Sequence, residues 1–202
     1  MKEFLSFDEV RSNGLKLAYK IHQSGFIPDV IYVSLRGGAC LGNIISEYFK
    51  VVRKNERPVF YAAVVAHSYS DIRQRSQVRV DGWTYNPDYL RSGDKILLVD
   101  DIFDWGTTIN YLVGILMEKG LPREDIKVAV HDYKVRPRKD GENPIQPDFY
   151  CRRHLIGGPE DDRWIHYMSH ELIGLNEEEI RLNYPARDEE LSTVFAFLQK
   201  NL

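Results

Sequence analysis

The sequence has few cysteines, no excess of basic residues and no long apolar run. Its two cysteines, Cys40 and Cys151, exclude a disulfide framework and a four-thiolate zinc site. Lys and Arg number 27 against 30 Asp and Glu, and this net charge of −3 argues against a general nucleic-acid binder. No segment approaches the roughly 18 apolar residues that cross a bilayer, so we expect no membrane partner.

The N-terminal residues and the composition indicate where the protein is located. The start, MKEFLSFDEV, contains acidic residues and no apolar core, so it does not look like a secretory signal. Apolar residues make up 43% and charged residues 28% of the 202 residues, which is typical of a folded globular protein. We therefore expect a reduced, cytoplasmic protein with one domain and an appendage.

Short apolar runs alternate with segments of helical periodicity, which predicts the α/β class with a parallel sheet. We expect strands at 29–34, 58–66, 95–99, 126–133, 149–150 and 164–167. We expect helices over 6–25, 41–49, 109–120 and 191–198. Residues 67–94 have no long apolar period, so a long functional or mobile loop is expected there.

The most informative local pattern is ILLVDDIFDWGTT, from Ile96 to Thr108. Its apolar residues predict a buried strand that ends in the adjacent carboxylates Asp100 and Asp101. The residues Asp104–Thr108 then open a helix, where backbone N–H groups and threonine hydroxyls can cradle an anion. Paired carboxylates beside such a cradle indicate a sugar phosphate held together with Mg²⁺. The alternative is an acidic strand end followed by an ordinary helix N-cap.

This pattern resembles the signature with which type I phosphoribosyltransferases bind 5-phosphoribosyl-1-pyrophosphate (PRPP). The family usually has a small hydroxyl residue or alanine where this chain has Trp105. The resemblance implies a parallel-sheet core over about 25–135, flanked by helices. It also implies a small hood formed by about 136–172 and the N-terminal helix. These parts make one domain over 1–172, and 173–202 are expected to be a helical extension.

The resemblance also implies roles for the residues of the motif. The residues expected to bind PRPP are Asp100, Asp101, Asp104, Trp105, Gly106, Thr107 and Thr108. Asp100 and Asp101 are expected to hold the ribose hydroxyls and the Mg²⁺ cofactor. Asp104 is the expected catalytic base, which handles the proton at purine N7.

A second motif, Ser34–Gly38, has a basic residue and two glycines after a predicted strand. Such a turn exposes backbone amides, although strand-to-helix turns with glycines are common. It resembles the pyrophosphate loop of hypoxanthine-guanine enzymes, which implies that Arg36 and Gly37 bind pyrophosphate. In that family the peptide before the basic residue can be cis, so the Leu35–Arg36 bond is a candidate.

A third motif lies at the start of the expected loop. Ser68 and Tyr69 resemble the Ser-Tyr pair of a lid that excludes water from the active site. Arg73, Arg75 and Arg79 follow in the same segment, and they can meet phosphates or form a solvated face.

Three further residues are expected to select the base, again by resemblance to the purine enzymes. Lys134 is expected to donate to the exocyclic oxygen at purine C6, which favours 6-oxopurines over adenine; the alternative is a surface lysine. Trp164 is expected to stack on the purine or to be a core aromatic, and the backbone of Ile165 is expected to read the base edge. Glu171, seven positions after Trp164, falls where these enzymes carry a metal-binding acid.

The sequence thus predicts a Mg²⁺-dependent purine phosphoribosyltransferase of the salvage type. Its partners are PRPP and hypoxanthine, guanine or xanthine, with no nucleic acid, in a homodimer or homotetramer. Three alternatives remain: a regulator that uses the PRPP fold as a sensor, a non-catalytic nucleotide-binding module, and an orotate or uracil enzyme.

Overall fold

A computed structural model gives the fold of residues 2–54, 56–69, 77–137, 145–184 and 189–199. The chain forms two compact units, residues 8–162 and residues 1–7 together with 163–202, and each is described by itself. The larger unit therefore contains the N-terminal helix, which the sequence had assigned to a hood. In the described part of the chain, no helix is both long and apolar enough to cross a membrane.

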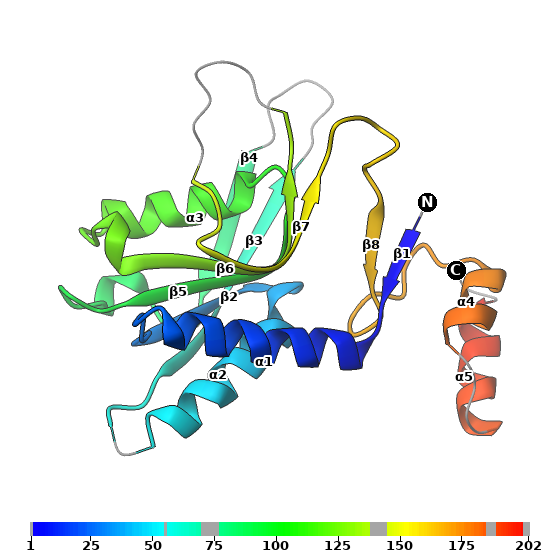
Figure 1. Cartoon of the computed structure of the whole chain (residues 1–202), viewed down its shortest axis with the longest axis horizontal. Helices are drawn as coiled ribbons and strands as arrows, with labels where there is room; N and C mark the ends of the chain where they lie inside the picture. The colour runs from blue at the N-terminus through cyan, green and yellow to red at the C-terminus, as the bar shows by residue number, and fades with distance from the viewer. Residues whose placement is uncertain (1, 55, 70–76, 138–144, 185–188, 200–202) are drawn as a thin grey trace. The chain divides into compact units, whose positions relative to one another are not determined.

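The larger unit is built on a six-stranded sheet with the order β4-β3-β2-β5-β6-β7 (Figure 1). Its strands are β2 (Val30–Leu35), β3 (Phe60–Tyr69), β4 (Gln77–Trp83), β5 (Ile96–Phe103), β6 (Ile126–Val135) and β7 (Phe149–Leu155). Only the β3–β4 pair is antiparallel among the described strands of this sheet. The predicted α/β class with a mostly parallel sheet is confirmed.

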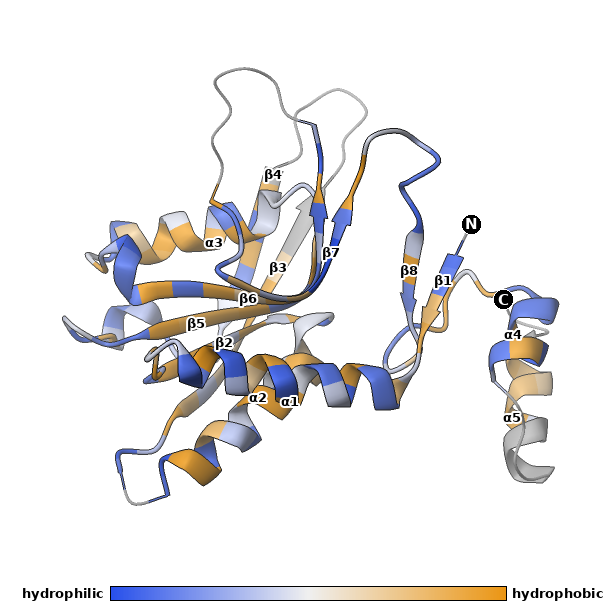
Figure 2. Ribbon diagram, viewed as in Figure 1, coloured by the Kyte–Doolittle hydropathy of each residue, from blue (hydrophilic) through white to orange (hydrophobic). Residues whose placement is uncertain are grey.

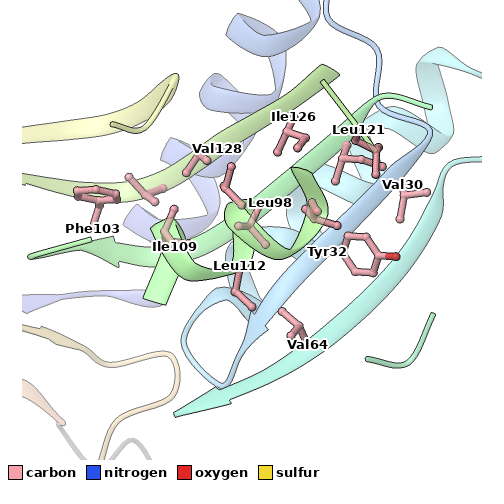
Figure 3. Close-up of a cluster of buried hydrophobic side chains, with 14 of the residues drawn as sticks. Val30, Tyr32, Val64, Leu98, Phe103, Ile109, Leu112, Leu121, Ile126 and Val128 are labelled. Atoms are coloured by element: carbon pink, nitrogen blue, oxygen red, sulfur yellow. The ribbon is translucent and has the colours of Figure 1, made fainter. Parts of the chain in front are cut away.

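Helices cover both faces of this sheet (Figure 1). They are α1 (Phe7–Gln23), α2 (Gly38–Val52) and α3 (Thr107–Glu118). Ile109 and Leu112 of α3 pack on one face with Leu98, Val128 and Tyr32 (Figure 3). The buried residues of α1 and α2 pack on the other face against Ile31, Val33, Leu97 and Val99. The central strands are therefore apolar on both faces, as parallel strands are (Figure 2).

The predicted long loop over 67–94 is wrong in part, because β3 continues to Tyr69 and β4 spans Gln77–Trp83. Strand β4 is an edge strand, and it alternates partly buried apolar residues with exposed polar ones over only a few positions. Trp83 still packs edge-on against the Tyr32 ring, with 4.8 Å between ring centroids. So short an alternation carries little signal in a sequence, since packing against β3 decides the structure.

The smaller unit has two parallel strands, β1 (Lys2–Leu5) and β8 (Trp164–Tyr167), in which Lys2 pairs with Trp164. It also contains α4 (Glu177–Asn183) and α5 (Glu189–Gln199). A capping box at Asn176 and Glu179 starts α4. The expected C-terminal helix corresponds to α5, and α4 also lies within the expected helical extension, whereas β1 was not foreseen.

Candidate active site

Two loops meet where the parallel strands β2 and β5 end. These strands pair directly, with Val33 opposite Val99, and the chain leaves them toward opposite sides of the sheet. Ligands of open α/β sheets bind in the crevice at such a switch point. We call this side of the sheet the carboxyl edge, and the opposite side, where the strands begin, the amino edge.

The first loop, Arg36–Gly38, approaches β5 closely at both of its glycines. A Cβ atom on Gly37 would lie 2.3 Å from Asp101 Oδ2, and one on Gly38 would lie 2.5 Å from the Val99 carbonyl oxygen. The Leu35–Arg36 peptide is cis, as expected for this loop. The backbone of the glycine loop, as we call Arg36–Gly38, therefore lies directly against the acidic pair.

The acidic pair follows the buried part of β5. The Asp101 amide donates to Asp100 Oδ1 at 3.0 Å, and the Ile102 amide donates to Asp101 Oδ1 at 2.7 Å. Burial and the neighbouring Asp101 carboxylate raise the pKa of Asp100 well above its usual range. Ionisation of both carboxyl groups is therefore unfavourable here, and a bound cation would relieve their repulsion.

The second loop, Asp104–Thr108, turns from β5 into α3 and is called the phosphate loop. Gly106 has a left-handed backbone with φ +77°, and a Cβ there would lie 2.1 Å from the Phe103 ring. The Asn110 side chain donates to the Gly106 carbonyl at 2.8 Å and so fixes the turn. A pocket of about 200 Å³ opens at this loop; its lining is Asp100, Ile102, Asp104, Trp105, Gly106, Thr107, Thr108 and Ile109.

Asp104 belongs to an ion-pair network that connects three segments of the carboxyl edge. Its Oδ1 accepts from Arg136 Nε and lies 2.5 Å from Arg136 Nη2. Arg136 Nη2 also lies 2.7 Å from Asp162 Oδ2, and Lys134 Nζ donates to Asp162 Oδ1 at 2.7 Å. The ion-pair network is thus Asp104, Lys134, Arg136 and Asp162, whose formal charges cancel.

Burial and hydrogen bonds shape the electrostatics of this network. The side chains of Lys134 and Arg136 are only 8% and 9% exposed, whereas that of Asp104 is 41% exposed. Hydrogen bonds from Lys134 and Arg136 lower the pKa of Asp162 below its ordinary value. Burial alone lowers the pKa of Arg136, but the hydrogen bonds to Asp162 and Asp104 outweigh it and raise that pKa.

Trp105 lies beside the network. The Arg136 guanidinium carbon is 4.6 Å from the centre of the Trp105 ring, a cation–π contact, and the indole is 62% exposed. The large side chain that departs from the family pattern is therefore engaged by the network.

The structure brings together part of the residues that the sequence singled out. Arg36, Gly37, Asp100, Asp101, Asp104 and Lys134 all lie at the carboxyl ends of β2, β5 and β6. Ser68 and Tyr69 end β3, and only their backbone is described. Arg73 and Arg75 lie outside the described residues, and Arg79 pairs with Asp81 at 2.7 Å.

The remaining predicted residues belong to the smaller unit. Trp164 is 62% exposed, whereas Ile165 is buried in β8. Glu171 Oε2 accepts from the Tyr167 amide at 3.0 Å and lies 3.4 Å from Nδ1 of the buried His166. Within its own unit, Glu171 therefore holds the end of β8.

Sequence reasoning missed Arg136 and Asp162. The signal for Arg136 was its place two residues after Lys134, because alternate residues at a strand end share one face. Asp162 lies two residues before Trp164 in a loop of mixed charge, and nothing local distinguishes it from Asp161. Their importance comes from pairing over 32 and 26 residues of chain, which a linear pattern does not contain.

The larger of the two cavities described, about 570 Å³, lies at the amino edge instead. Its lining is Ser24, Gly25, Phe26, Ile27, Lys95, Lys127, Asp148 and Phe149. Both of its lysines are already paired with an acid, Lys95 with Asp125 and Lys127 with Asp148. Cavity volume alone would therefore select the amino edge and not the acidic pair and the phosphate loop.

The family model of the phosphoribosyl transferase domain matches residues 6–152. That range contains the glycine loop, the acidic pair, the phosphate loop, Lys134 and Arg136, but not Asp162 and, of the smaller unit, only residues 6 and 7. No curated protein sequence matches the chain.

Solved structures of low sequence identity share the fold. A purine phosphoribosyltransferase from Pyrococcus horikoshii Ot3 is 19% identical, with a TM-score of 0.63 over 87% of this chain and 98% of that one. A hypothetical protein from Neisseria gonorrhoeae, solved with bound ppGpp, is 21% identical, with a TM-score of 0.65 over 93% and 98%. The xanthine-guanine-hypoxanthine phosphoribosyltransferase of Helicobacter pylori is 19% identical, with a TM-score of 0.54 over 83% and 90%.

Proposed function

We propose that this chain, which belongs to the phosphoribosyltransferase domain family, transfers the 5-phosphoribosyl group of PRPP to a 6-oxopurine. A bond forms between a ring nitrogen of the purine and ribose C1, and the bond from C1 to pyrophosphate breaks. The products are a nucleoside monophosphate and pyrophosphate.

One observation carries the proposal: the glycine loop packs on the acidic pair beside the pocket at the phosphate loop. A glycine loop that lies against Asp101 offers backbone N–H groups to a pyrophosphate. The first turn of α3, which starts at Thr107, offers N–H groups to the 5′-phosphate. In this proposal Asp100 and Asp101 bind the ribose hydroxyls, between the two anion sites.

The donor set fits Mg²⁺. This ion takes oxygen ligands and is usually bound through one or two carboxylates together with substrate phosphates. Asp100 and Asp101 are such a pair, and burial together with the neighbouring Asp101 carboxylate raises the pKa of Asp100, an environment that a bound cation would make more favourable for the ionised form. The described residues contain no group of three or more His, Cys, Asp or Glu side chains that could hold a metal, so PRPP itself completes the site in this proposal. When bound, Mg²⁺ neutralises charge on the leaving pyrophosphate.

Asp104 is the proposed general base. Its carboxylate is 41% exposed beside the phosphate pocket, so it can reach the purine N7 proton as the bond to C1 forms. Arg36 and Gly37 are proposed to bind the pyrophosphate, and Ser68 and Tyr69 remain the proposed lid.

Three residues are proposed to select the base. Lys134 supports a 6-oxopurine, because an ammonium group donates to an exocyclic oxygen and not to an amino group. The exposed ring of Trp164 offers a stacking surface, and the Ile165 backbone remains the proposed reader of the base edge. The Pyrococcus and Helicobacter enzymes act on purines by name, and the gonococcal protein binds a guanine nucleotide, which supports the same class. Glu171 remains a proposed ligand of the Mg²⁺ site, in addition to Asp100 and Asp101.

A cytoplasmic location and a homodimer or homotetramer complete the proposal. Light scattering of the purified chain measures its mass against the 23.5 kDa of one protomer.

The test of the function is pyrophosphate release with PRPP, Mg²⁺ and one base at a time. The panel is hypoxanthine, guanine, xanthine, adenine, uracil and orotate. We expect turnover confined to one or more 6-oxopurines. Turnover with orotate or uracil would replace the proposed acceptor. PRPP binding without turnover of any base would favour a sensor.

A further inference from the structure

We propose that Arg136 is a positioning residue: its guanidinium orients the Asp104 carboxylate and ties the phosphate loop to the loop that carries Asp162. The inference rests on the proposed function, because it takes Asp104 as the general base.

The Arg136 guanidinium contacts two carboxylates and one aromatic ring. Nε and Nη2 meet the same oxygen of Asp104, Oδ1, at 2.5 Å, and Nη2 also lies 2.7 Å from Asp162 Oδ2. The guanidinium carbon lies over the Trp105 ring, 4.6 Å from its centre. A planar fork with five donors makes these contacts together, which an ammonium group does not.

This geometry leaves one oxygen of Asp104 for chemistry. Both contacts from Arg136 fall on Oδ1, and the described residues give Oδ2 no hydrogen-bond partner. Because Oδ1 is held, rotation of the carboxylate is restricted and Oδ2 keeps one direction. A base must point at the proton that it takes, and an error of about 1 Å can cost roughly 100-fold in rate.

Arg136 itself is held from two other segments. It follows β6, which ends at Val135, and its side chain is only 9% exposed. Asp162, which also pairs with Lys134, contacts Nη2, and the guanidinium lies over the Trp105 ring. A tryptophan in the phosphate loop therefore has a use that a small hydroxyl residue does not provide: it restrains the group that restrains Asp104.

The alternative is that Arg136 is an ordinary structural ion pair. The chain offers a matched control in Arg123, whose Nη2 lies 3.0 Å from Asp148 Oδ2 at the amino edge. Arg123 is also partly buried, at 30% exposed, and belongs to no part of the proposed site. Loss of a structural pair changes stability in both places, whereas loss of a positioning residue changes turnover at Arg136 only.

The experiment compares wild type, Arg136→Gln, Arg136→Lys and Arg123→Gln. It measures kcat and both KM values with the preferred base, the Kd of PRPP with Mg²⁺ by calorimetry, and Tm. For Arg136→Gln we expect kcat to fall about 30- to 100-fold, with the KM and Kd of PRPP within about 3-fold of wild type. Arg136→Lys should recover part of kcat, since it keeps the charge without the fork. Arg123→Gln should keep kcat.

Two results would overturn the role of Arg136 while wild type turns over. One is a kcat of Arg136→Gln within about 3-fold of wild type. The other is an equal loss of kcat and PRPP affinity in Arg136→Gln, with no recovery in Arg136→Lys. If Arg136→Gln does not fold, Arg136→Lys takes its place. A lower kcat with an unchanged Kd of PRPP then supports the role, and an equal loss of kcat and PRPP affinity overturns it. Wild type without turnover on any base would overturn the proposed function, and this role with it.

Discussion

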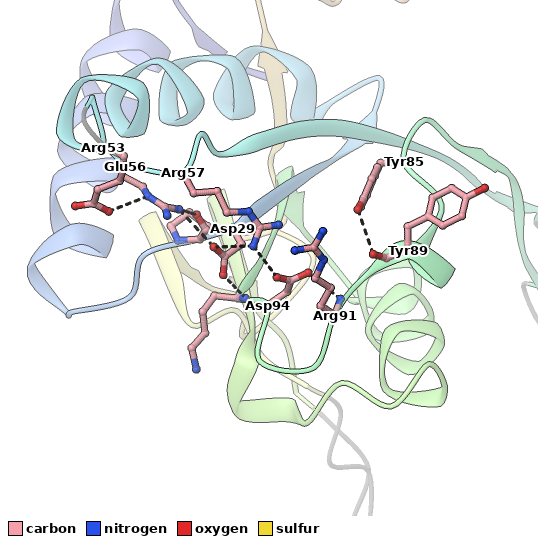
Figure 4. Close-up of polar contacts among 10 residues, drawn as sticks. Asp29, Arg53, Glu56, Arg57, Tyr85, Tyr89, Arg91 and Asp94 are labelled. Atoms are coloured by element: carbon pink, nitrogen blue, oxygen red, sulfur yellow. Dashed lines mark hydrogen bonds and ion pairs between the residues drawn. The ribbon is translucent and has the colours of Figure 1, made fainter.

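Both edges of the central sheet carry acid–base pairs, but the acids have different partners. At the amino edge two acids also accept from a backbone amide: Asp29 from Lys95 and Asp94 from Arg91, at 2.9 and 2.8 Å. Figure 4 shows that Arg53 pairs with Asp29 and that Arg57 pairs with Asp94. There the charged side chains fasten one stretch of backbone to another.

At the carboxyl edge the ion-pair network joins side chains to side chains. Asp104 and Asp162 meet Arg136 and Lys134, and each contact ends on a group that can rotate. A backbone amide is fixed by the fold, whereas a side chain can exchange its partner for a substrate. The comparison applies to the ion-pair network, whose acids contact side chains, whereas the acidic pair accepts from backbone amides as Asp29 and Asp94 do.

The largest expected effect is on catalysis at the carboxyl edge. Asp104→Asn removes the proposed base and keeps its shape, so kcat should fall about 100-fold or more. PRPP should still bind, because the backbone of the phosphate loop is unchanged. Steady-state kinetics and calorimetry with PRPP and Mg²⁺ measure the two quantities. Unchanged turnover would remove Asp104 from the mechanism.

Asp132 sharpens the comparison, since it is fully buried and yet has side-chain partners. Its carboxylate meets His131, Arg152 and His154 at 2.6 to 2.7 Å. Burial raises the pKa of Asp132, but these hydrogen bonds outweigh it and hold that pKa well below its usual range. Asp132→Asn should lower the free energy of unfolding by about 3 kcal/mol near neutral pH, because Arg152 loses its counter-charge and a buried hydrogen-bond acceptor is removed.

The pH dependence of this effect has a definite sign. A depressed pKa stabilises the fold above the unfolded value of about 3.9, and the stabilisation is lost as pH falls toward the folded value. The gap between wild type and Asp132→Asn should therefore narrow below about pH 4, by at most about 1.4 kcal/mol per pH unit. Urea unfolding of both proteins at pH 6, 4 and 3 measures it. A gap that widens in acid would contradict the assignment.

At the amino edge, Asp148→Ala should cost about 2 kcal/mol of stability and leave turnover nearly unchanged. Asp148 accepts from the Val128 amide at 2.9 Å, and its loss leaves that buried donor without a partner. Its pairs with Arg123 and Lys127 are lost as well. Chemical unfolding measures the loss of stability, and kcat/KM below the transition temperature measures turnover. A large loss of turnover in the folded variant would erase the distinction between the edges.

Lys134→Ala should raise the KM of the preferred base about 10- to 30-fold, the worth of one charged hydrogen bond. The KM of PRPP should change much less. Kinetics with each substrate varied in turn separate the two values. Equal increases would mean that Lys134 does not read the base.

The smallest expected effect comes from Trp105→Thr, which restores a small hydroxyl residue to the phosphate loop. An exposed cation–π contact is worth about 0.5–1 kcal/mol. Without it the Arg136 guanidinium is less restrained, so kcat should fall about 2- to 5-fold. Initial rates at saturating PRPP and base measure this loss. A gain in kcat would show that Trp105 obstructs the site.

The sequence predicted the structural features that depend on one short stretch of chain. The run from Ile96 to Thr108 predicted a strand, an acidic pair and a helix start, and the structure has all three in order. The strand, the acidic pair and the helix start depend on neighbours in the chain, so a linear pattern contains them. The cis peptide before Arg36 was implied by the family resemblance alone, and it is confirmed.

Long-range pairing was beyond the sequence. Strand β4 depends on packing against β3, and β1 depends on β8, which follows it by about 160 residues of chain. The contact of Arg136 with Asp104 depends in turn on how far β5 and β6 extend before they turn. The expected roles of the site residues follow the family pattern, and they remain proposals until the variants are measured.

The central claim is that substrate binds at the carboxyl edge and that the amino edge only fastens the fold. Titration of the ¹⁵N-labelled chain with PRPP and Mg²⁺, followed by amide chemical shifts, tests it most directly. We predict that the amides of Gly37, Gly106 and Thr107 shift, while those of Lys95 and Val128 stay in place. Shifts centred on Lys95 and Val128, beside the larger cavity, would contradict the account.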